Sequence, residues 1–341
     1  MKEEGTMKFR RNLTTILALA VAMTLITGTA LCAKTIKIRY AHVGVEGAPQ
    51  TRYANALEKR IEAVTEGRVQ VDVFPNGQLG GKQEMVDGVQ LGTIGMAMHD
   101  FAALEGIYKP VAVFGCPYAF KSPQHAIDAT QHQRSELMQE MNKELVKRGN
   151  VRFVGSVFRG ARQLSANFPV YSPADMKGKK FRGPASQLWV TMYKGLGAIP
   201  TPIEFSELAT ALMTGVVVGQ DNPLTNIYAG KLYEVQTHIM MTYHMTGPVA
   251  VFMNNKLYES IPEGDRKKID DVFLALADET VQWMAEANET IVGKLKKEGI
   301  TFIDASNGLK TDEFRAAVMK QVGIDYPNWG PLIKRIDAAE R

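Results

Sequence analysis

Residues 176–223 decide the fold: they begin MKGKKFRGPAS, continue through a helical run to GAIPTPIEF, and end SELATALMTGVVVGQDNP. Arg182 stands at the end of a short apolar strand, directly before Gly183-Pro184, where a new helical pattern starts. A guanidinium beside a helix N-terminus favours a bound carboxylate, because both supply N–H donors and positive charge. The alternative is that Arg182 belongs to a solvated basic turn with three neighbouring lysines. The sequence on either side must decide between these interpretations.

The N-terminal segment has the pattern of an export signal. Residues 7–33 read MKFRRNLTTILALAVAMTLITGTALCA, with basic residues before an apolar run at about residues 16–26 and small residues after it. The apolar run is shorter than the roughly 20 residues that a membrane-spanning helix needs. We therefore interpret residues 1–33 as a secretory signal peptide, cleaved after Cys32 or Ala33, rather than as a membrane anchor.

The composition argues against several classes of protein. The chain has 341 residues and a formal net charge of +4, and its basic residues are dispersed, which gives no argument for a nucleic-acid partner. Signal-peptide removal would leave Cys116 alone or nearly so, and we expect this cysteine to pack in the core. Phosphate-binding loops, zinc-protease, serine-hydrolase and EF-hand motifs are missing from the sequence, so we predict no catalytic residue, metal or cofactor.

Hydrophobic periodicity in the first half predicts alternating strands and helices. A strand at about residues 34–43 precedes a helix at 50–65, and a second strand follows at 69–74. A short helix through residues 85–89 then leads to a third strand at 93–99. This order predicts a parallel or mixed sheet with covering helices.

The second half predicts another lobe and one long helix. A helical pattern at about 122–148 and a strand at 151–158 come before a second group of strands and helices. Residues 262–298 carry one continuous apolar stripe, and about 37 helical residues would span roughly 55 Å. We therefore predict an α/β fold with two lobes, each a mixed sheet covered by helices, and a long helix across both. The predicted lobes comprise residues 34–159 with about 248–287, and residues 160–247 with about 288–341.

The residues just after the predicted strands are candidates for a binding site. Ligands of open α/β sheets lie at the carboxyl ends of the strands. Those positions hold Val43, His99, Asp100 and the segment 158–162. His99-Asp100 has no further ligand at a defined spacing, so we interpret it as pocket or turn polarity rather than as a metal site.

Several ordered segments resemble one known family. They are FPNGQLGG, MVDGVQLGTIGM, GARQLSANFPV, PADMKGKKFRGP, LGAIPTPIEFSEL, TALMTGVVVGQDNP and KLYEVQTHI. Together they resemble the DctP-type substrate-binding proteins of TRAP transporters, the tripartite ATP-independent periplasmic systems. The similarity extends from about Lys34 to about Ile300 and is far more specific than one short motif.

The resemblance implies a periplasmic binding protein fold whose two lobes close on an organic acid. It implies delivery of that acid to the small and large membrane subunits of a permease, by a monomer that catalyses nothing. The family's selectivity arginine corresponds to Arg182, a second arginine to Arg162, the carboxylate-contacting asparagine to Asn222 and a pocket aromatic to Phe205. A bidentate guanidinium–carboxylate pair would fix the orientation of the ligand.

Departures from the family pattern bear on the shape of the ligand more than on its class. Gly183, Asp221 and Val218 stand where the family often has valine, glutamate and aspartate. We expect a partly apolar pocket and a small or medium monocarboxylate, hydroxylated or with an apolar or aromatic tail. The residues expected to make the pocket partly apolar are Val43, Phe158, Trp189 and Phe205.

Alternatives remain open at this point. His99 and Asp100 could bind a hydroxyl or an amine, and Trp189 could equally be a core residue. The ligand could also be a sugar acid of the uronate type. A secreted enzyme on the same scaffold is a less favoured interpretation, because the sequence lacks nucleophile and metal motifs. A ligand-sensing subunit would use the same pocket and would differ only in the partner that docks on the lobes.

Overall fold

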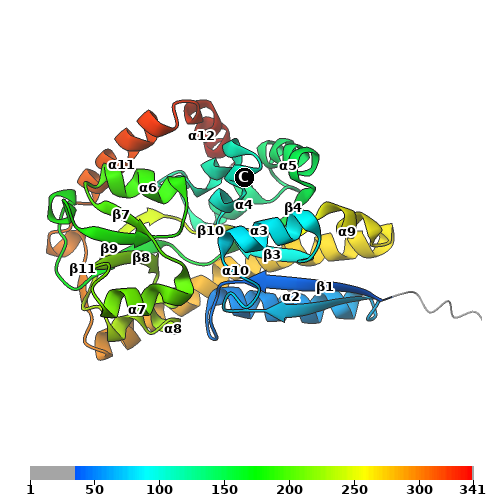
Figure 1. The fold of residues 1–341 in the computed structure, drawn as a ribbon, viewed down its shortest axis with the longest axis horizontal. Helices are drawn as coiled ribbons and strands as arrows, with labels where there is room; N and C mark the ends of the chain where they lie inside the picture. The colour runs from blue at the N-terminus through cyan, green and yellow to red at the C-terminus, as the bar shows by residue number, and fades with distance from the viewer. Residues whose placement is uncertain (1–34, 340–341) are drawn as a thin grey trace, which may run out of the picture. The chain divides into compact units, whose positions relative to one another are not determined.

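The computed structural model describes residues 35–339, in which two mixed β-sheets are covered by helices (Figure 1). The predicted signal peptide lies outside the described residues. In the first sheet β1 and β3 are parallel, whereas β10 runs antiparallel to both β3 and β4. The order of its strands is β2 (Val69–Phe74), β1 (Ile36–His42), β3 (Met96–His99), β10 (Pro248–Asn254) and β4 (Val151–Phe158).

The second sheet has six strands, and it too is mixed. β5 pairs antiparallel with β8 and β9, while β6 pairs parallel with β7 and β8. The strand order is β11 (Thr301–Ile303), β9 (His238–Met245), β5 (Arg162–Ala166), β8 (Gly219–Pro223), β6 (Lys180–Gly183) and β7 (Ile199–Pro202). The two mixed sheets agree with the predicted α/β fold class.

Helices pack against both sheets. Those that contact the first sheet or its neighbours are α2 (Pro49–Val64), α3 (Lys82–Leu91), α4 (Pro123–Thr130), α5 (Glu136–Gly149) and α9 (Asn255–Ser260), with the 3-10 helices η1 (Phe101–Gly106) and η2 (Lys109–Gly115). Those that contact the second sheet or its neighbours are α6 (Gln187–Gly195), α7 (Leu208–Met213), α8 (Leu224–Ala229) and α11 (Thr311–Asp325), with η3 (Pro173–Met176), η4 (Phe205–Glu207), η5 (Leu232–Glu234) and η6 (Ala305–Asn307). The last helix, α12 (Trp329–Asp337), packs on α5 and η2. No helix of the described residues is long and apolar enough to span a bilayer.

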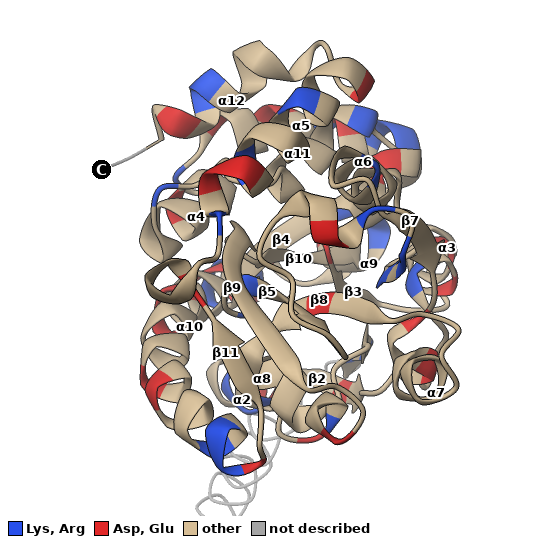
Figure 2. Cartoon of the chain, turned by 90° about the vertical axis from the view of Figure 1, so that its left-hand side faces the viewer, with Lys and Arg blue, Asp and Glu red and all other residues tan. Residues whose placement is uncertain are grey.

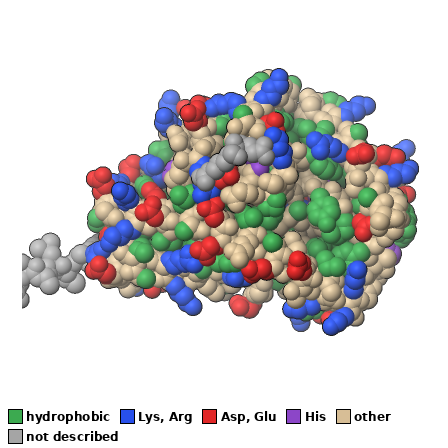
Figure 3. Space-filling model, turned by 180° about the vertical axis from the view of Figure 1, so that it is seen from behind, with side chains coloured by type: hydrophobic (Ala, Val, Ile, Leu, Met, Phe, Trp, Pro, Cys, Tyr) green, Lys and Arg blue, Asp and Glu red, His purple; other side chains and the backbone are tan. Residues whose placement is uncertain are grey.

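The helix α10 (Glu263–Lys297) contacts elements of both sheets, as predicted. It packs on α2 and β4 beside the first sheet and on α8 beside the second. Its first turn carries acidic side chains and its last turn lysines, which stabilises the helix dipole. Figures 2 and 3 show both signs of charge interspersed over the faces in view, as the dispersed sequence charges predict.

The prediction of one helix at 122–148 is wrong, because the structure has two helices there, α4 and α5. The chain leaves helical geometry at Gln131, and α5 starts again after Ser135, whose hydroxyl accepts the Met138 N–H. Arg134, inside this break, donates to Asp128 and Asp278. The break therefore bonds to the nearby α4 and also to α10, which is remote in sequence, and hydrophobic periodicity does not report a contact of the second kind.

Two short crossovers join the sheets side by side. One connects β4 to β5 through Gly160, and the other connects β9 to β10 through Gly247. Both glycines have positive φ, at 97° and 77°. The Arg159 N–H donates to the Gly247 carbonyl at 3.3 Å, and a Cβ on Gly247 would lie only 2.0 Å from the Gly160 oxygen. The crossovers therefore require glycine at position 247.

Replacing Gly247 tests this close approach. Gly247→Ala should lower the free energy of unfolding by at least about 2 kcal/mol, because the new methyl group meets backbone and the φ angle is strained. As a control, Gly293→Ala in α10 meets nothing within 4 Å and should stabilise the helix by up to about 1 kcal/mol. Urea unfolding of both variants measures the difference, and equal stability would contradict the argument.

Candidate ligand-binding site

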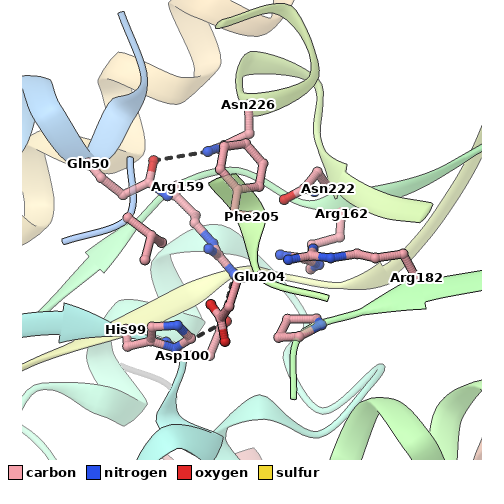
Figure 4. A pocket seen from close by; sticks show the side chains of 12 residues that line it. Gln50, His99, Asp100, Arg159, Arg162, Arg182, Glu204, Phe205, Asn222 and Asn226 are labelled. Carbon is pink, nitrogen blue, oxygen red and sulfur yellow. Dashed lines mark hydrogen bonds and ion pairs between the residues drawn. The ribbon is translucent and has the colours of Figure 1, made fainter. Parts of the chain in front are cut away.

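A cavity lies where strand ends of the two sheets meet (Figure 4). Its walls come from residues that follow β1, β3 and β4 on one side, and from β6, β8 and the loop after β7 on the other. The lining residues are Val43, Gln50, His99, Asp100, Arg159, Arg162, Arg182, Pro184, Glu204, Phe205, Asn222 and Asn226. In the described residues no group of three or more His, Cys, Asp or Glu side chains is arranged to hold a metal ion.

A buried carboxylate organises one side of this cavity. Asp221 on β8 is fully buried and accepts from Arg162 on the neighbouring β5, which also donates to the Asp221 backbone carbonyl. Trp189 Nε1 and the Tyr193 hydroxyl each donate to Oδ1 at 3.0 Å, and His244 Nε2 lies 3.1 Å from Oδ2. Burial alone would raise the pKa of Asp221, but Arg162 and His244 hold it far below its ordinary value. The residue is therefore ionised and fully bonded.

Arg182 is the cavity's uncompensated cation. Its side chain is 3% exposed, and its Nε donates to the Ile203 carbonyl at 2.7 Å. Its own carbonyl accepts from the Tyr193 hydroxyl at 2.9 Å, so both ends of the residue are held. No carboxylate among the described residues forms an ion pair with it. Burial, and then repulsion from Arg162, lower the pKa of Arg182 to about 10, which still leaves it charged at neutral pH.

Other predicted residues surround these two arginines. The Asn222 side chain donates to the Gln220 side chain, which leaves one amide N–H for another partner. Phe205 lines the same cavity. Trp189 is buried, with its ring 5.2 Å from the Arg162 guanidinium carbon, and it lines a second pocket that shares three of its lining residues with the cavity.

The first sheet supplies a second polar cluster. Arg159 Nη2 donates to the Asp100 carboxylate, and the Asp100 backbone N–H donates to His99 Nδ1 at 2.8 Å. Burial lowers the pKa of His99 to about 4, so its ring is neutral at pH 7. Because Nδ1 accepts, the proton of the neutral ring is on Nε2. Val43 lies beside this cluster in the cavity wall.

Phe158 is the predicted pocket residue that the structure places elsewhere. It packs in a buried apolar cluster with Ile127, Ala277 and Met284, and its N–H donates to the Thr280 hydroxyl. The next residue, Arg159, lines the cavity instead. The sequence prediction included the segment 158–162 but did not name Arg159 as a site residue.

Sequence reasoning missed the residues that reach the cavity from helices and loops. They are Gln50, Arg159, Pro184, Glu204 and Asn226. Gln50 on α2 accepts a hydrogen bond from Asn226 on α8 at 3.1 Å, which joins the two sides of the cavity (Figure 4). A polar residue at the start of a helix after a strand was the available signal for Gln50.

Further contacts link the two sides around the cavity. Lys82 Nζ donates to the Ala185 carbonyl, and the Gln187 N–H donates to Glu105 at 3.3 Å. A Cβ on Gly81 would lie 2.9 Å from the Glu204 carboxyl carbon. The two sides of the cavity are therefore in direct contact around it.

The sequence of residues 40–323 matches the model of a protein family described as bacterial extracellular solute-binding protein, family 7, or DctP. The match covers most of the chain, which therefore belongs to this family of solute-binding proteins. The recognition drawn from the sequence motifs is confirmed, as is the two-lobed α/β fold with a long helix.

Individual relatives share both sequence and fold. A C4-dicarboxylate-binding periplasmic protein DctP from Shewanella loihica is 32% identical over 297 residues, covering 85% of each chain. A TRAP periplasmic solute-binding protein from Roseobacter denitrificans, solved with bound L-galactonate, is 27% identical with a TM-score of 0.81, covering 88% of this chain and 98% of the other. One from Bordetella bronchispeptica, with density assigned to pantoate, is 28% identical with a TM-score of 0.81, covering 90% and 100%.

Removing the charge of Asp221 should destabilise the fold. Asp221→Asn leaves Arg162 buried without its counter-charge, and breaking such a pair costs about 3–5 kcal/mol. The pKa of Asp221 is depressed by folding, so its stabilising contribution is present above the unfolded pKa and is lost on acidification. The variant should therefore unfold at lower urea at pH 7, and its stability should fall less steeply between pH 5 and pH 3.

The exposed pair of Glu144 and Arg148 provides the control. Its members lie on the surface of α5, one turn apart. Glu144→Gln should leave the melting temperature nearly unchanged, because exposed ion pairs contribute little. A melting temperature for Asp221→Asn equal to that of Glu144→Gln would contradict a structural role for the buried pair.

Proposed function

We propose that this protein is the extracytoplasmic solute-binding subunit of a TRAP transporter. It captures an organic acid between two lobes and delivers it to a membrane permease made of a small and a large subunit. After removal of residues 1–33 it works in the periplasm as a monomer. The proposed lobes comprise residues 34–159 with about 248–287, and residues 160–247 with about 288–341. Family membership and a cavity between the two sheets support this proposal.

One observation carries the choice of an acid as ligand: Arg182 is buried in the cavity wall without a carboxylate partner in the described chain. A buried, unpaired guanidinium is unfavourable, and a ligand carboxylate would remove that cost. The planar guanidinium can donate two parallel hydrogen bonds to one carboxylate, which fixes the ligand's orientation. Asn222 would donate its remaining amide N–H to the same group.

The lining favours a small or medium monocarboxylate that is hydroxylated or has an apolar or aromatic tail. Val43 and Phe205 supply apolar wall in the cavity, and Trp189 lines the second pocket beside it. A sugar acid is the alternative within the same class, since polar side chains are also plentiful and a relative is solved with L-galactonate. Neither ligand requires chemistry from the protein, and we propose a binding role without catalysis.

The binding proposal predicts a strong dependence on Arg182. Arg182→Ala should weaken binding of the acid at least about 100-fold, because it removes one partner of a desolvated ion pair. Arg182→Lys should also weaken binding, since an ammonium cannot reproduce the planar fork. Native mass spectrometry for a co-purified acid, followed by thermal-shift screening of carboxylates, identifies the probe for calorimetry.

Arg148→Ala serves as the matched control, because this arginine is more than half exposed and lies outside the cavity. It should bind the same acid as the unmodified protein does. If Arg182→Ala binds carboxylates as tightly as Arg148→Ala, the proposed role of the buried arginine is wrong.

A further inference from the structure

The polar cluster on the first sheet gives the cavity a second charged end. Asp100 follows β3 and Arg159 follows β4, and the two side chains form a buried ion pair beside His99 (Figure 4). Arg182 comes from β6 of the other sheet, so a ligand held by Arg182 would extend from one sheet towards the other. The charges and hydrogen-bonding groups at this second end therefore determine which chemical group the ligand can carry at the end away from Arg182.

Charge pairing already differs between the two ends. Arg159 is neutralised by Asp100, and Arg162 is neutralised by Asp221. Arg182 alone of these three arginines forms no ion pair within the described chain. One ligand carboxylate therefore completes the pairing of the cavity arginines. A second carboxylate would lie near Asp100, whose partner Arg159 is already paired, and repulsion between buried like charges is strong.

The Asp100 carboxylate stays ionised in this position. Burial alone would raise its pKa, but Arg159 and then His99 outweigh burial, and the pKa lies below its ordinary value. Protonation of Asp100 therefore does not relieve the repulsion of a second ligand carboxylate at neutral pH. The same reasoning leaves Asp100 as a hydrogen-bond acceptor with no proton of its own to donate.

The hydrogen-bonding groups at this end match a hydroxyl. Asp100 accepts through its carboxylate, whereas neutral His99 presents Nε2–H as a donor, because its Nδ1 accepts from the Asp100 backbone. A hydroxyl donates one hydrogen bond and accepts another, so it satisfies both residues at once. A ligand ammonium would pair with Asp100 but would lie beside the Arg159 guanidinium, which opposes it.

We propose that Asp100, held by Arg159, is a specificity determinant that accepts a ligand hydroxyl and excludes a second ligand carboxylate. This inference rests on the proposed function, because it takes Arg182 as the site of the first carboxylate. The ligand class is then a hydroxylated monocarboxylic acid, although several relatives carry the name of a C4-dicarboxylate-binding protein.

Matched pairs of acids test this determinant by calorimetry at pH 7.5. The probes are 4-hydroxybutyrate with succinate, and L-galactonate with galactarate, so that each pair differs by a hydroxymethyl or a carboxylate end. The unmodified protein should bind the hydroxy acid of at least one pair at least tenfold more tightly than its dicarboxylate. Asp100→Asn should reduce that ratio at least tenfold, because it frees Arg159 for the second carboxylate.

Glu144→Gln is the control for net charge. Glu144 pairs with Arg148 on the surface of α5 and does not line the cavity. Its substitution removes one negative charge as Asp100→Asn does, yet it should change the ratio less than threefold. An equal change in both variants would show that net charge alone sets the preference, which overturns the proposal.

The double variant Asp100→Asn with Arg159→Gln removes both charges of this buried pair, so neither partner is left unpaired, and it protects the test against misfolding. It should also lower the preference for the hydroxy acid, at least threefold. Equal or tighter binding of the dicarboxylate by the unmodified protein overturns the inference, as does an unchanged ratio in the variants. In those cases acid binding that depends on Arg182 leaves the proposed function standing. If the protein binds no acid of the panel and none in the thermal-shift screen, both the role of Asp100 and the proposed function are wrong.

Discussion

The buried pair of Arg162 and Asp221 is the interaction on which the site depends. Burying two charges is expensive unless every hydrogen-bonding position is used. Here Trp189 and Tyr193 from α6 and His244 from β9 bond to the carboxylate, while the guanidinium reaches both the side chain and the backbone of Asp221. One carboxylate thus ties a helix and three strands together directly beneath the cavity.

This pairing also sets the charge that a ligand meets. Asp221 bonds to Arg162 and its other donors, whereas the nearby guanidinium of Arg182 donates to the Ile203 carbonyl and forms no ion pair among the described residues. Burial and the nearby Arg162 guanidinium both lower the pKa of Arg182. The fold already holds the Arg182 guanidinium in place, so a carboxylate at the proposed site would meet a donor that is already oriented.

Sequence patterns were sufficient to predict the helices and strands that depend on local hydrophobic periodicity. The long helix α10 and the alternation of strands and helices in the first half follow from apolar spacing. Arg162 and Arg182 came from ordered motifs of a known family. The role of Asp221 did not, because it depends on β5 lying beside β8, about 60 residues apart in the chain. The same holds for the break at Gln131, whose contacts reach α10.

The placement of Arg159 and Arg162 connects ligand recognition to the join between the sheets. Arg159 follows the last residue of β4 and Arg162 begins β5, so the crossover itself separates the two charged ends of the cavity. The Arg159 N–H bonds to Gly247 in the second crossover. Any rotation of one sheet relative to the other through these segments must move Asp100 and Arg159 relative to Arg162. A ligand that contacts both ends therefore binds one relative position of the sheets more tightly than others, which is the requirement for coupling capture to closure.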